Sequence, residues 1–505
     1  MQIPYRHSEN IKINQQPKDA SVKQFDAERL VIVMVPDKPG KTVWDRLAHA
    51  DILKARYQRR LRQEKSCRQI ALDLPNSNGT HVILQAIKPD SSTFELLTLA
   101  RKLAAKTRPH DPSAVLLQVT DFESGPAQRI TECMTAALLA ASCPMPSYKS
   151  EAAAAVALKQ IKIHGLGKTL DLSQVQAEIV GNHLARWLSA LPPNELTPGS
   201  YRKLVERIAK KEGWTMKFLD HKALVRKKAG AFLAVAQGSP VADAGIVQLR
   251  YQPKKRSTKK LALVGKGICF DTGGVNVKPA KYMNGMHEDM QGSAVALGSL
   301  LALSRLKAPF AIDCWLALAE NHIGSKAYKP NDVITASNGT TIEVKHTDAE
   351  GRMVLADTLA LACKEKPRAL IDYATLTGAC IYSLTSRYSG VFSNRDKLNE
   401  TLITAGRDSG ERVWPFPLDP DFDEALKSEI ADIIQCSLEG DADHILAARF
   451  LKRFVDDDID WVHVDLSASN RKGGLGHIPT DTTGFGVRYT LNLMLQQKML
   501  NNKWN

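Results

Sequence analysis

Two segments of the sequence concentrate residue types that hold metal ions in proteins. The first contains Lys266, Asp271 and Asp289, and a Gly273-Gly274 pair follows the first of the two aspartates. Consecutive glycines permit a tight turn, because glycine adopts positive φ without strain. We therefore expect a turn after Asp271 that exposes its carboxylate rather than burying it.

The second segment carries alternating acidic residues within His346-Thr347-Asp348-Ala349-Glu350-Gly351-Arg352. Successive side chains of an extended backbone point to opposite sides, so alternate residues share a side. In that conformation the carboxylates of Asp348 and Glu350 converge on one cation, and Arg352 comes next along the same side. An apolar, helix-like run from Met353 to Leu359 follows.

Together the two segments supply four carboxylates and one lysine, a set that suits a pair of hard divalent cations. Two such cations about 3.5–4 Å apart need bridging carboxylates that offset their mutual repulsion. Lys266 joins such a site only as a neutral amine, a form that burial and a nearby dication both favour by lowering its pKa. Taken singly, each acidic residue has an ordinary explanation as a turn former or a solvated strand edge, so only the combination indicates a two-metal site.

In these motifs the sequence resembles the leucyl aminopeptidase (cytosol aminopeptidase) family, peptidase family M17. The family signature, usually asparagine-threonine-aspartate-alanine-glutamate-glycine-arginine, is present here with His346 first and Thr347 to Arg352 intact. The likeness covers most of the chain from Asn194 onward. Its other motifs are Gly265-Lys266-Gly267, Phe270 to Gly274, Lys278-Pro279, Ala374 to Ala379, Glu411 to Trp414 and Thr483 to Arg488.

The resemblance implies a role for each matching residue. One divalent cation, Mn²⁺ or Zn²⁺, would be held by Lys266, Asp271, Asp289 and Glu350, and a second by Asp271, Asp348 and Glu350. Lys278 and Arg352 would be the catalytic side chains, with Arg352 holding a bicarbonate ion. The pocket for the first side chain of the substrate would be lined by Met286, Thr375, Leu376 and Gly378.

The same resemblance implies the reaction, which is release of leucine-like and other N-terminal amino acids from peptides by a water molecule that two metal ions activate. It also implies a homohexamer. An alternative function is a DNA-binding accessory or regulatory role as a second activity, because some bacterial members of the family bind DNA. A non-catalytic paralogue would require lost metal ligands, and the sequence retains all of them.

Several residues depart from the family pattern beside the metal ligands. His346 replaces the signature asparagine and could act as an extra metal ligand, as a protonated partner of Asp348, or merely as a larger neighbour. Around Asp289 the differing residues are His287, Glu288, Gln291 and Ser293. These changes bear on rate and metal preference, whereas the expected metal ligands are unchanged.

Alternating strand-like and helix-like runs predict the elements that position these residues. Apolar runs at 30–35, 82–86 and 114–119 indicate a small N-terminal α/β domain over 1–170. Helical spacing from Leu172 to Leu191, stopped by Pro192-Pro193, predicts a linking helix within 171–193. Strand-like runs at 261–264, 311–317 and 369–373 predict a larger catalytic domain over 194–505, with a mostly parallel central sheet flanked by helices.

Composition favours a globular chain that works in the cytoplasm. Of 505 residues, 44% are hydrophobic and 24% charged, and the eight cysteines show no CxxC pairing. The sequence begins in polar residues without a signal-like apolar run, and no run is long enough to span a membrane. The formal net charge of +14 arises partly from basic runs at 54–68, 226–228 and 254–260. Such runs are usually solvated surfaces, and DNA is the alternative partner.

Overall fold

The computed structural model describes residues 5, 9–88, 90–110, 112–151, 158–255, 257–502 and 504. The chain divides into two compact units, each described here by itself. The smaller unit comprises Tyr5–Ile179 together with Leu475–Pro479, and the larger comprises Val180–Gly474 and Thr480–Asn505. The division falls within helix α7 (Ser173–Ser189), which the sequence correctly predicts as a helix ending before Pro192.

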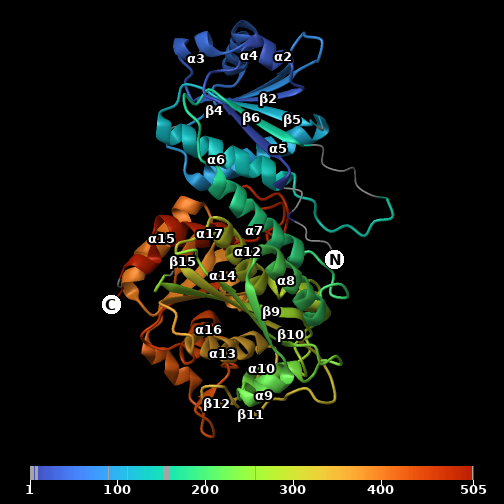
Figure 1. Ribbon diagram of the computed structural model, residues 1–505, viewed down its shortest axis with the longest axis vertical. Coiled ribbons are helices and arrows are strands. Elements are labelled where there is room, and N and C mark those ends of the chain that lie inside the picture. Colours follow the sequence, from blue (N-terminus) through green and yellow to red (C-terminus); the bar gives the residue numbers. More distant parts are fainter. Residues whose placement is uncertain are drawn as a thin grey trace. The chain divides into compact units, whose positions relative to one another are not determined.

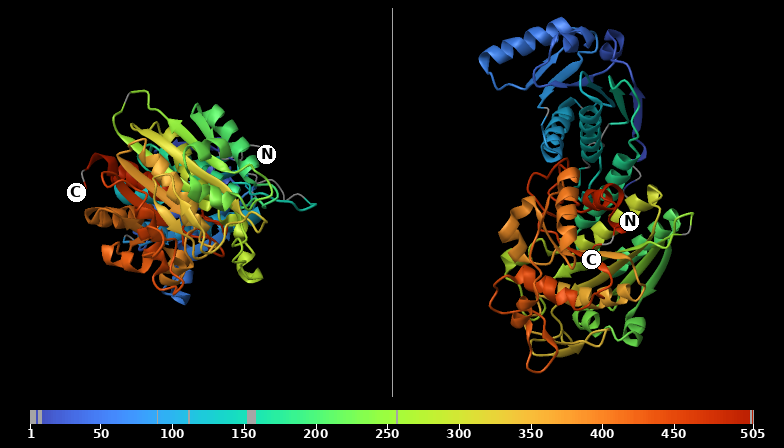
Figure 2. Two further views of the ribbon diagram at one scale, coloured as in Figure 1. Left: turned by 90° about the horizontal axis from the view of Figure 1, so that it is seen from below. Right: turned by 90° about the vertical axis from the view of Figure 1, so that its left-hand side faces the viewer.

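The smaller unit is built on a six-stranded sheet in the order β1-β6-β5-β2-β4-β3, parallel except for the β3–β4 pair. Helices α5 and α6 cover one face of this sheet and α3 and α4 the other (Figures 1 and 2). The three predicted strands are confirmed as β2, β4 and β5. The bounds are β1 Lys12–Gln16, β2 Leu30–Pro36, β3 Gln69–Asp73, β4 His81–Ile87, β5 Ala114–Val119, β6 Gln160–His164, α2 Val22–Asp26, α3 Lys41–Arg46, α4 Ala50–Gln63, α5 Thr93–Thr107 and α6 Ser124–Ala141.

The larger unit contains an eight-stranded sheet in the order β15-β14-β17-β13-β9-β10-β8-β7. Its four middle strands, β17, β13, β9 and β10, are mutually parallel, and antiparallel pairs occur toward both edges. This arrangement confirms the predicted mostly parallel sheet. The bounds are β7 Thr215–Leu219, β8 Gly245–Tyr251, β9 Lys260–Asp271, β10 Ala311–Asn321, β13 Ala369–Ala374, β14 Ser389–Ser393, β15 Val413–Pro415 and β17 Asp460–Asp465.

Helices cover both faces of the large sheet (Figure 1). Helices α8, α12 and α17 lie on one face, and α10, α13 and α16 lie on the other. A three-stranded sheet of β11, β12 and β16 belongs to the same unit. The bounds are α8 Pro198–Glu212, α9 His221–Arg226, α10 Gly230–Ala236, α12 Gln291–Arg305, α13 Glu350–Cys363, α14 Gly378–Leu384, α15 Asn399–Ser409, α16 Asp443–Lys452, α17 Val487–Leu491, β11 Val333–Thr335, β12 Thr341–Glu343 and β16 Ile433–Ile434.

The composition of the central elements explains why they lie inside. Strand β10 and helix α13 are buried along their whole lengths, as expected where a parallel sheet is covered on both faces. Helix α12 approaches the sheet closely through Gly292, where a Cβ atom would come within 2.1 Å of the Tyr373 carbonyl oxygen. Close packing here sets the start of α12, just after Asp289, against Tyr373 of β13 and Lys266 of β9.

Candidate active site

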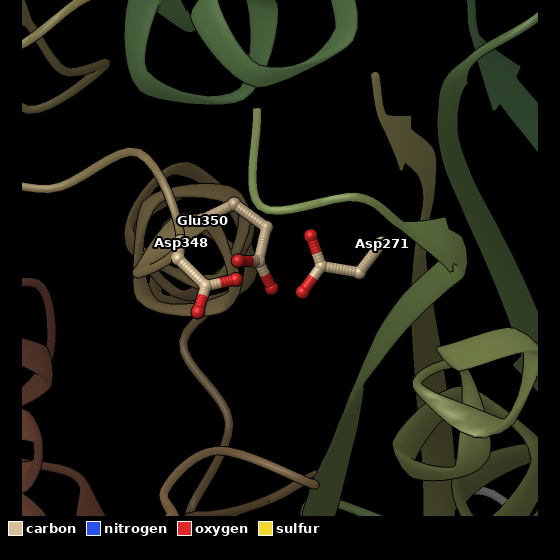
Figure 3. A group of neighbouring side chains, drawn as sticks. All are labelled: Asp271, Asp348 and Glu350. Atoms are coloured by element: carbon tan, nitrogen blue, oxygen red, sulfur yellow. The ribbon is translucent and has the colours of Figure 1, made fainter. Parts of the chain in front are cut away.

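Three carboxylates of the larger unit converge on one point (Figure 3). Asp271 is the last residue of β9, Asp348 lies in the turn before α13, and Glu350 is the first residue of α13. One oxygen of each carboxylate lies within 4.8 Å of an oxygen of both others. Convergent oxygen donors of this kind are the ligands that hard divalent cations prefer.

The backbone around Asp348 differs from the expected extended conformation. Because the apolar run from Met353 folds as a buried helix that begins at Glu350, Asp348 lies in the preceding turn. The two carboxylates converge because turn and helix start meet there, so the extended-strand explanation is wrong. Arg352 therefore does not continue the same side: its guanidinium contacts Gln435 and Asp443.

The turn after Asp271 forms as predicted, with φ of 86° at Gly273 and 66° at Gly274. The expectation that it exposes Asp271 is wrong, since that residue is only 2% exposed. Strand β9 continues through Asp271, and a register shift in β10 places Asn321 opposite it. The Asn321 amide and the Gly273 N–H each donate to Asp271 Oδ1 at 2.8 Å.

Lys266 lies inside β9 rather than after a shorter strand, because the buried strand runs on to Asp271. Its Nζ is 2.9 Å from Asp289 Oδ1 and 2.9 Å from Glu350 Oε1. It also donates to the Thr375 carbonyl oxygen at 3.0 Å, while the Thr375 hydroxyl donates to Asp289 Oδ1 at 2.7 Å. The amine is thus held between two of the expected metal ligands.

Lys278 occupies the corresponding position beside the other two carboxylates. Its Nζ is 2.9 Å from Asp271 Oδ2 and 2.5 Å from Asp348 Oδ1. The Lys278 side chain is 15% exposed, whereas that of Lys266 is 4% exposed. Of the two amines, Lys278 is therefore the one with more access to solvent.

The charges of this cluster explain the direction of each pKa shift. Burial alone would lower the pKa of Lys266 and of Lys278, but the surrounding carboxylates raise the pKa of both above its usual value. Burial raises the pKa of Asp289. Burial, together with the negative charges of Asp271 and Glu350, raises the pKa of Asp348 to about 7.

The cluster fits divalent cations on two observations. Four carboxylates face two ammonium groups, which leaves negative charge in excess in a buried place. Asp289 Oδ2 and Glu350 Oε2 are buried without a hydrogen-bond partner. Buried carboxylate oxygens are normally paired or coordinate a metal, so the donor set suits the implied cations.

The surroundings of Arg352 suit a free bicarbonate ion less well than the carboxylate cluster suits divalent cations. Its guanidinium is 3% exposed; Nη1 donates to the Gln435 carbonyl oxygen at 3.2 Å and Nη2 to Asp443 Oδ1 at 2.8 Å. The anion beside this arginine is thus a carboxylate of the chain itself. Burial would lower the pKa of Arg352, and the Asp443 charge raises it.

His346 forms hydrogen bonds from within the turn that carries Asp348. Its Nδ1 accepts a hydrogen bond from the Asp348 N–H at 3.3 Å, as a turn-forming side chain does. Burial and the Lys278 charge lower the pKa of His346, which disfavours the protonated-partner alternative. Its backbone N–H donates to the Gln435 side chain.

Among the residues that differ around Asp289, Glu288, Gln291 and Ser293 form side-chain hydrogen bonds. Gln291 is buried and donates to Glu288 Oε2 at 3.3 Å, and the Asn470 amide donates to the same oxygen at 2.6 Å. Ser293 donates to the Met290 carbonyl oxygen at 2.7 Å. Burial lowers the pKa of His287 and raises that of Glu288.

The expected substrate-binding residues lie on two segments. Met286 begins a 3₁₀ turn three residues before Asp289, and Thr375, Leu376 and Gly378 follow β13. Met286, Thr375 and Leu376 are half-buried and Gly378 is exposed. Through its contacts with Lys266 and Asp289, Thr375 joins the second segment to the metal-ligand cluster.

Sequence reasoning missed Asp465, the last residue of β17, which holds the other end of that segment. Asp465 Oδ1 accepts from the Leu376 N–H at 3.2 Å, and Oδ2 accepts from the Thr377 hydroxyl at 2.6 Å. Thr377 caps α14 by accepting from the Cys380 N–H. An acidic residue ending a buried strand, as Asp271 also does, was the available signal.

The basic runs lie on exposed surface. On α4, Lys54, Arg56, Arg59 and Arg60 are exposed while Leu53 and Tyr57 are buried, which is the pattern of a solvated helix face. Residues 226–228 are exposed as well, and Arg256 of the third run lies outside the described residues. No helix in the described part of the chain is long and apolar enough to cross a membrane.

Comparison with known proteins points to one family. The Cytosol aminopeptidase family, catalytic domain, matches residues 183–491. A probable cytosol aminopeptidase from Chlorobaculum tepidum is 39% identical over 343 residues, which is 67% of this chain and 68% of that protein. One from Synechococcus sp. is 34% identical over 443 residues, 86% of this chain and 88% of that protein.

Among solved structures, a mutant of tomato leucine aminopeptidase superposes with a TM-score of 0.83 at 28% sequence identity. The match covers 96% of each chain. Because it extends over almost the whole length, it includes the N-terminal part, where the sequence motifs give no guidance. The fold class predicted from sequence is thereby confirmed for the chain.

Proposed function

The chain belongs to the cytosol aminopeptidase family, and we propose that it releases N-terminal amino acids from peptides with two divalent cations held by the carboxylate cluster. That the protein is an aminopeptidase follows from the family. The proposal adds the metals, the residues that hold them and the preferred substrates. It assigns the reaction to the domain predicted over 194–505, after an N-terminal domain over 1–170 and a helix within 171–193.

The proposed ligands divide into two sets that share members. Asp271 and Glu350 belong to both sets; Lys266 and Asp289 complete one, and Asp348 completes the other. Bound Mn²⁺ or Zn²⁺ would supply a Lewis acid that polarises a carbonyl group and lowers the pKa of a water molecule. The convergence of three carboxylates and the unpartnered oxygens of Asp289 and Glu350 support this assignment.

We assign Lys278 the task of stabilising negative charge on the oxygen of the scissile carbonyl. Its amine is held by Asp271 and Asp348, and the carboxylates that raise its pKa keep it charged at neutral pH. A fixed positive charge next to a developing oxyanion typically lowers the barrier by a few kcal/mol. Lys266 has no such task, because it belongs to the ligand set.

The bound cations would also account for attack at the N-terminus. A free α-amino group in its neutral form is a nitrogen ligand for a divalent cation, whereas an internal peptide nitrogen is a poor one. Met286 and the segment from Thr375 to Gly378 are proposed to receive the first side chain. Methionine adapts to apolar groups of varied shape, so leucine- and methionine-like residues should be preferred without strict exclusion of others.

Assembly and location are proposed from the family alone. We propose a homohexamer, which sedimentation velocity of the purified protein would test. A cytoplasmic location is supported by the name of the relatives, cytosol aminopeptidase. DNA binding receives no support from the comparisons, and we do not propose it.

The observation that carries the proposal is the convergence of Asp271, Asp348 and Glu350 on one point. Its test is release of leucine from leucinamide by the pure protein with added Mn²⁺ or Zn²⁺. Glu350→Gln should abolish the release, because the amide cannot replace a charged bridging ligand. Glu365→Gln is the matched control, since Glu365 lies just past the end of the same helix and pairs with Arg250. Lack of release by the metal-loaded wild type would refute the proposal.

A further inference from the structure

Arg352 is held on two sides by segments that are distant in the sequence. It is the third residue of α13, and its Nη1 donates to the carbonyl oxygen of Gln435, which follows β16. Its Nη2 donates to Asp443 Oδ1 at 2.8 Å. Nε is buried without a hydrogen-bond partner. The guanidinium is therefore fixed in place and already has a negatively charged partner.

Two local features of the fold position Asp443 beside Arg352. Asp443 is the first residue of α16, and the preceding Ala442 has a φ of 51°, a left-handed conformation that non-glycine residues rarely adopt. The Gln435 side chain accepts from the N–H groups of Lys345 and His346 and donates to the Ala349 carbonyl oxygen. The segment that leads to Asp443 is thus tied to the same loop that carries Asp348.

The charge of Asp443 disfavours a second anion on Arg352. A guanidinium grips a planar anion with two adjacent donors, either Nη1 and Nη2 or Nε and Nη2. Both pairs include Nη2, which already donates to Asp443. A bicarbonate ion at either pair would share that nitrogen with a carboxylate of the same charge, and like charges at such separation repel.

We propose that the Asp443 carboxylate is the resident anion of Arg352 in this chain and takes the place of a free bicarbonate ion. The inference rests on the proposed function and gives Asp443 the role of a positioning residue that acts through Arg352. Its consequence is an aminopeptidase whose rate does not depend on bicarbonate. The side chain of Asp443 is 32% exposed, so it can be replaced without opening a hole in the core.

The test compares wild type with Asp443→Ala in carbon dioxide-depleted buffer and after addition of bicarbonate. Wild-type kcat for leucinamide should be the same in both. Asp443→Ala should lose roughly tenfold or more in kcat without bicarbonate, as expected for a lost charge partner of a positioned group, and should recover most of it with bicarbonate. The matched control is Asp423→Ala, which removes the carboxylate partner of Arg449 on the same helix α16. It should behave like wild type in both buffers.

A binding measurement separates this inference from the proposed function. ¹³C-bicarbonate resonances should broaden on addition of Asp443→Ala but not of wild type or Asp423→Ala. Saturable activation of the wild type by bicarbonate would overturn the inference, as would an Asp443→Ala protein that is fully active without bicarbonate. A folded Asp443→Ala protein that neither binds bicarbonate nor recovers with it would show a merely structural ion pair and would also overturn it. If no protein hydrolyses leucinamide, the proposed function fails while the binding result still decides the inference.

Discussion

Lys266 and Lys278 show how two identical side chains receive different tasks from their surroundings. Each amine lies between two carboxylates, but Lys266 is also bonded to the Thr375 carbonyl oxygen and is nearly inaccessible. Lys278 keeps some exposure at the side of Asp271 and Asp348. The first is therefore suited to a ligand set and the second to contact with substrate.

Replacing Lys278 with methionine removes one positive charge and tests whether the two lysines have separate tasks. Lys278→Met retains most of the side-chain volume but removes the ammonium group, so kcat for leucinamide should fall about 10²- to 10³-fold, the usual effect of losing one oxyanion donor. Metal content, measured by mass spectrometry of the dialysed protein, should stay at the wild-type level.

The matched variant Lys266→Met should instead lower the metal content. If Lys278→Met lost its metals as completely as Lys266→Met, or if it kept wild-type kcat, the assignment of separate tasks would be wrong.

Residue types and spacing were enough to predict the members of the cluster but not how they meet. The glycine pair after Asp271 predicts an exposed carboxylate, yet the strand continues and buries it. The alternating acidic residues predict an extended segment for Asp348 and Glu350, yet the helix starts at Glu350. Asn321 and Asp443 carry no local signal, since a β-bulge and a distant helix start bring them in.

At the scale of elements, the segment from Thr375 to Gly378 depends on both of its attachments. The Thr377 hydroxyl donates to Asp465 Oδ2 and accepts from the Cys380 N–H. Thr377→Val removes both bonds at nearly constant shape. A lost buried hydrogen bond costs about 1–3 kcal/mol, so KM for leucinamide should rise roughly 5- to 150-fold.

Thr377→Ser keeps the hydroxyl and should restore the wild-type KM, while kcat should change much less in either variant. Steady-state kinetics give both numbers. Equal KM for the valine and serine variants would contradict a positioning role for the Asp465 contact.

Helix α13 needs a glycine at its second residue. A Cβ on Gly351 would lie 2.6 Å from both Cε and Nζ of Lys266. Because the clash is with the end of a flexible side chain, Gly351→Ala should fold but displace the amine, weakening metal binding and lowering activity at least about tenfold. Isothermal titration with Mn²⁺ and a leucinamide assay would measure the two effects.

Gly125→Ala provides the control for this prediction. Gly125 is the second residue of α6, and a Cβ there meets no atom within 4 Å. It should bind Mn²⁺ and hydrolyse leucinamide as the wild type does. Wild-type metal affinity in Gly351→Ala would mean that the position of the Lys266 amine is unimportant.

The buried carboxyl group of Asp357 on α13 makes the stability of the fold depend on pH. Asp357 accepts from the N–H groups of Phe232 and Ser337, but burial raises its pKa from 3.8 to about 6. Because this pKa is higher in the folded than in the unfolded protein, the protonated carboxyl group stabilises the fold. The contribution is fully present below about pH 4 and is lost as the pH rises through about 6, which lowers the free energy of unfolding by roughly 3 kcal/mol.

The melting temperature of wild type relative to Asp357→Asn should therefore fall between pH 4 and pH 7, since every other group titrates in both proteins. Differential scanning calorimetry at the two pH values measures it. A difference that is constant with pH would show that Asp357 is ionised throughout.

At the scale of the whole molecule, the fold was predictable because apolar strand and helix runs alternate along the chain. The central strands β9, β10 and β13 are mostly apolar and almost entirely buried, as parallel strands covered on both faces are. The short segment Leu475–Pro479 packs with the smaller unit although it lies far from it in sequence. Nothing in local periodicity could have indicated that partition, because it is a tertiary contact.

The central claim is that the carboxylate cluster holds two catalytic cations, and the most direct measurement joins metal content to activity. Protein freed of metal by chelation and dialysis should not release leucine from leucinamide. Titration with Mn²⁺ or Zn²⁺ should restore activity to saturation at two bound ions per chain, and Asp348→Asn should bind fewer ions and stay inactive. Full activity of the metal-free protein, or full activity in Asp348→Asn, would contradict the account.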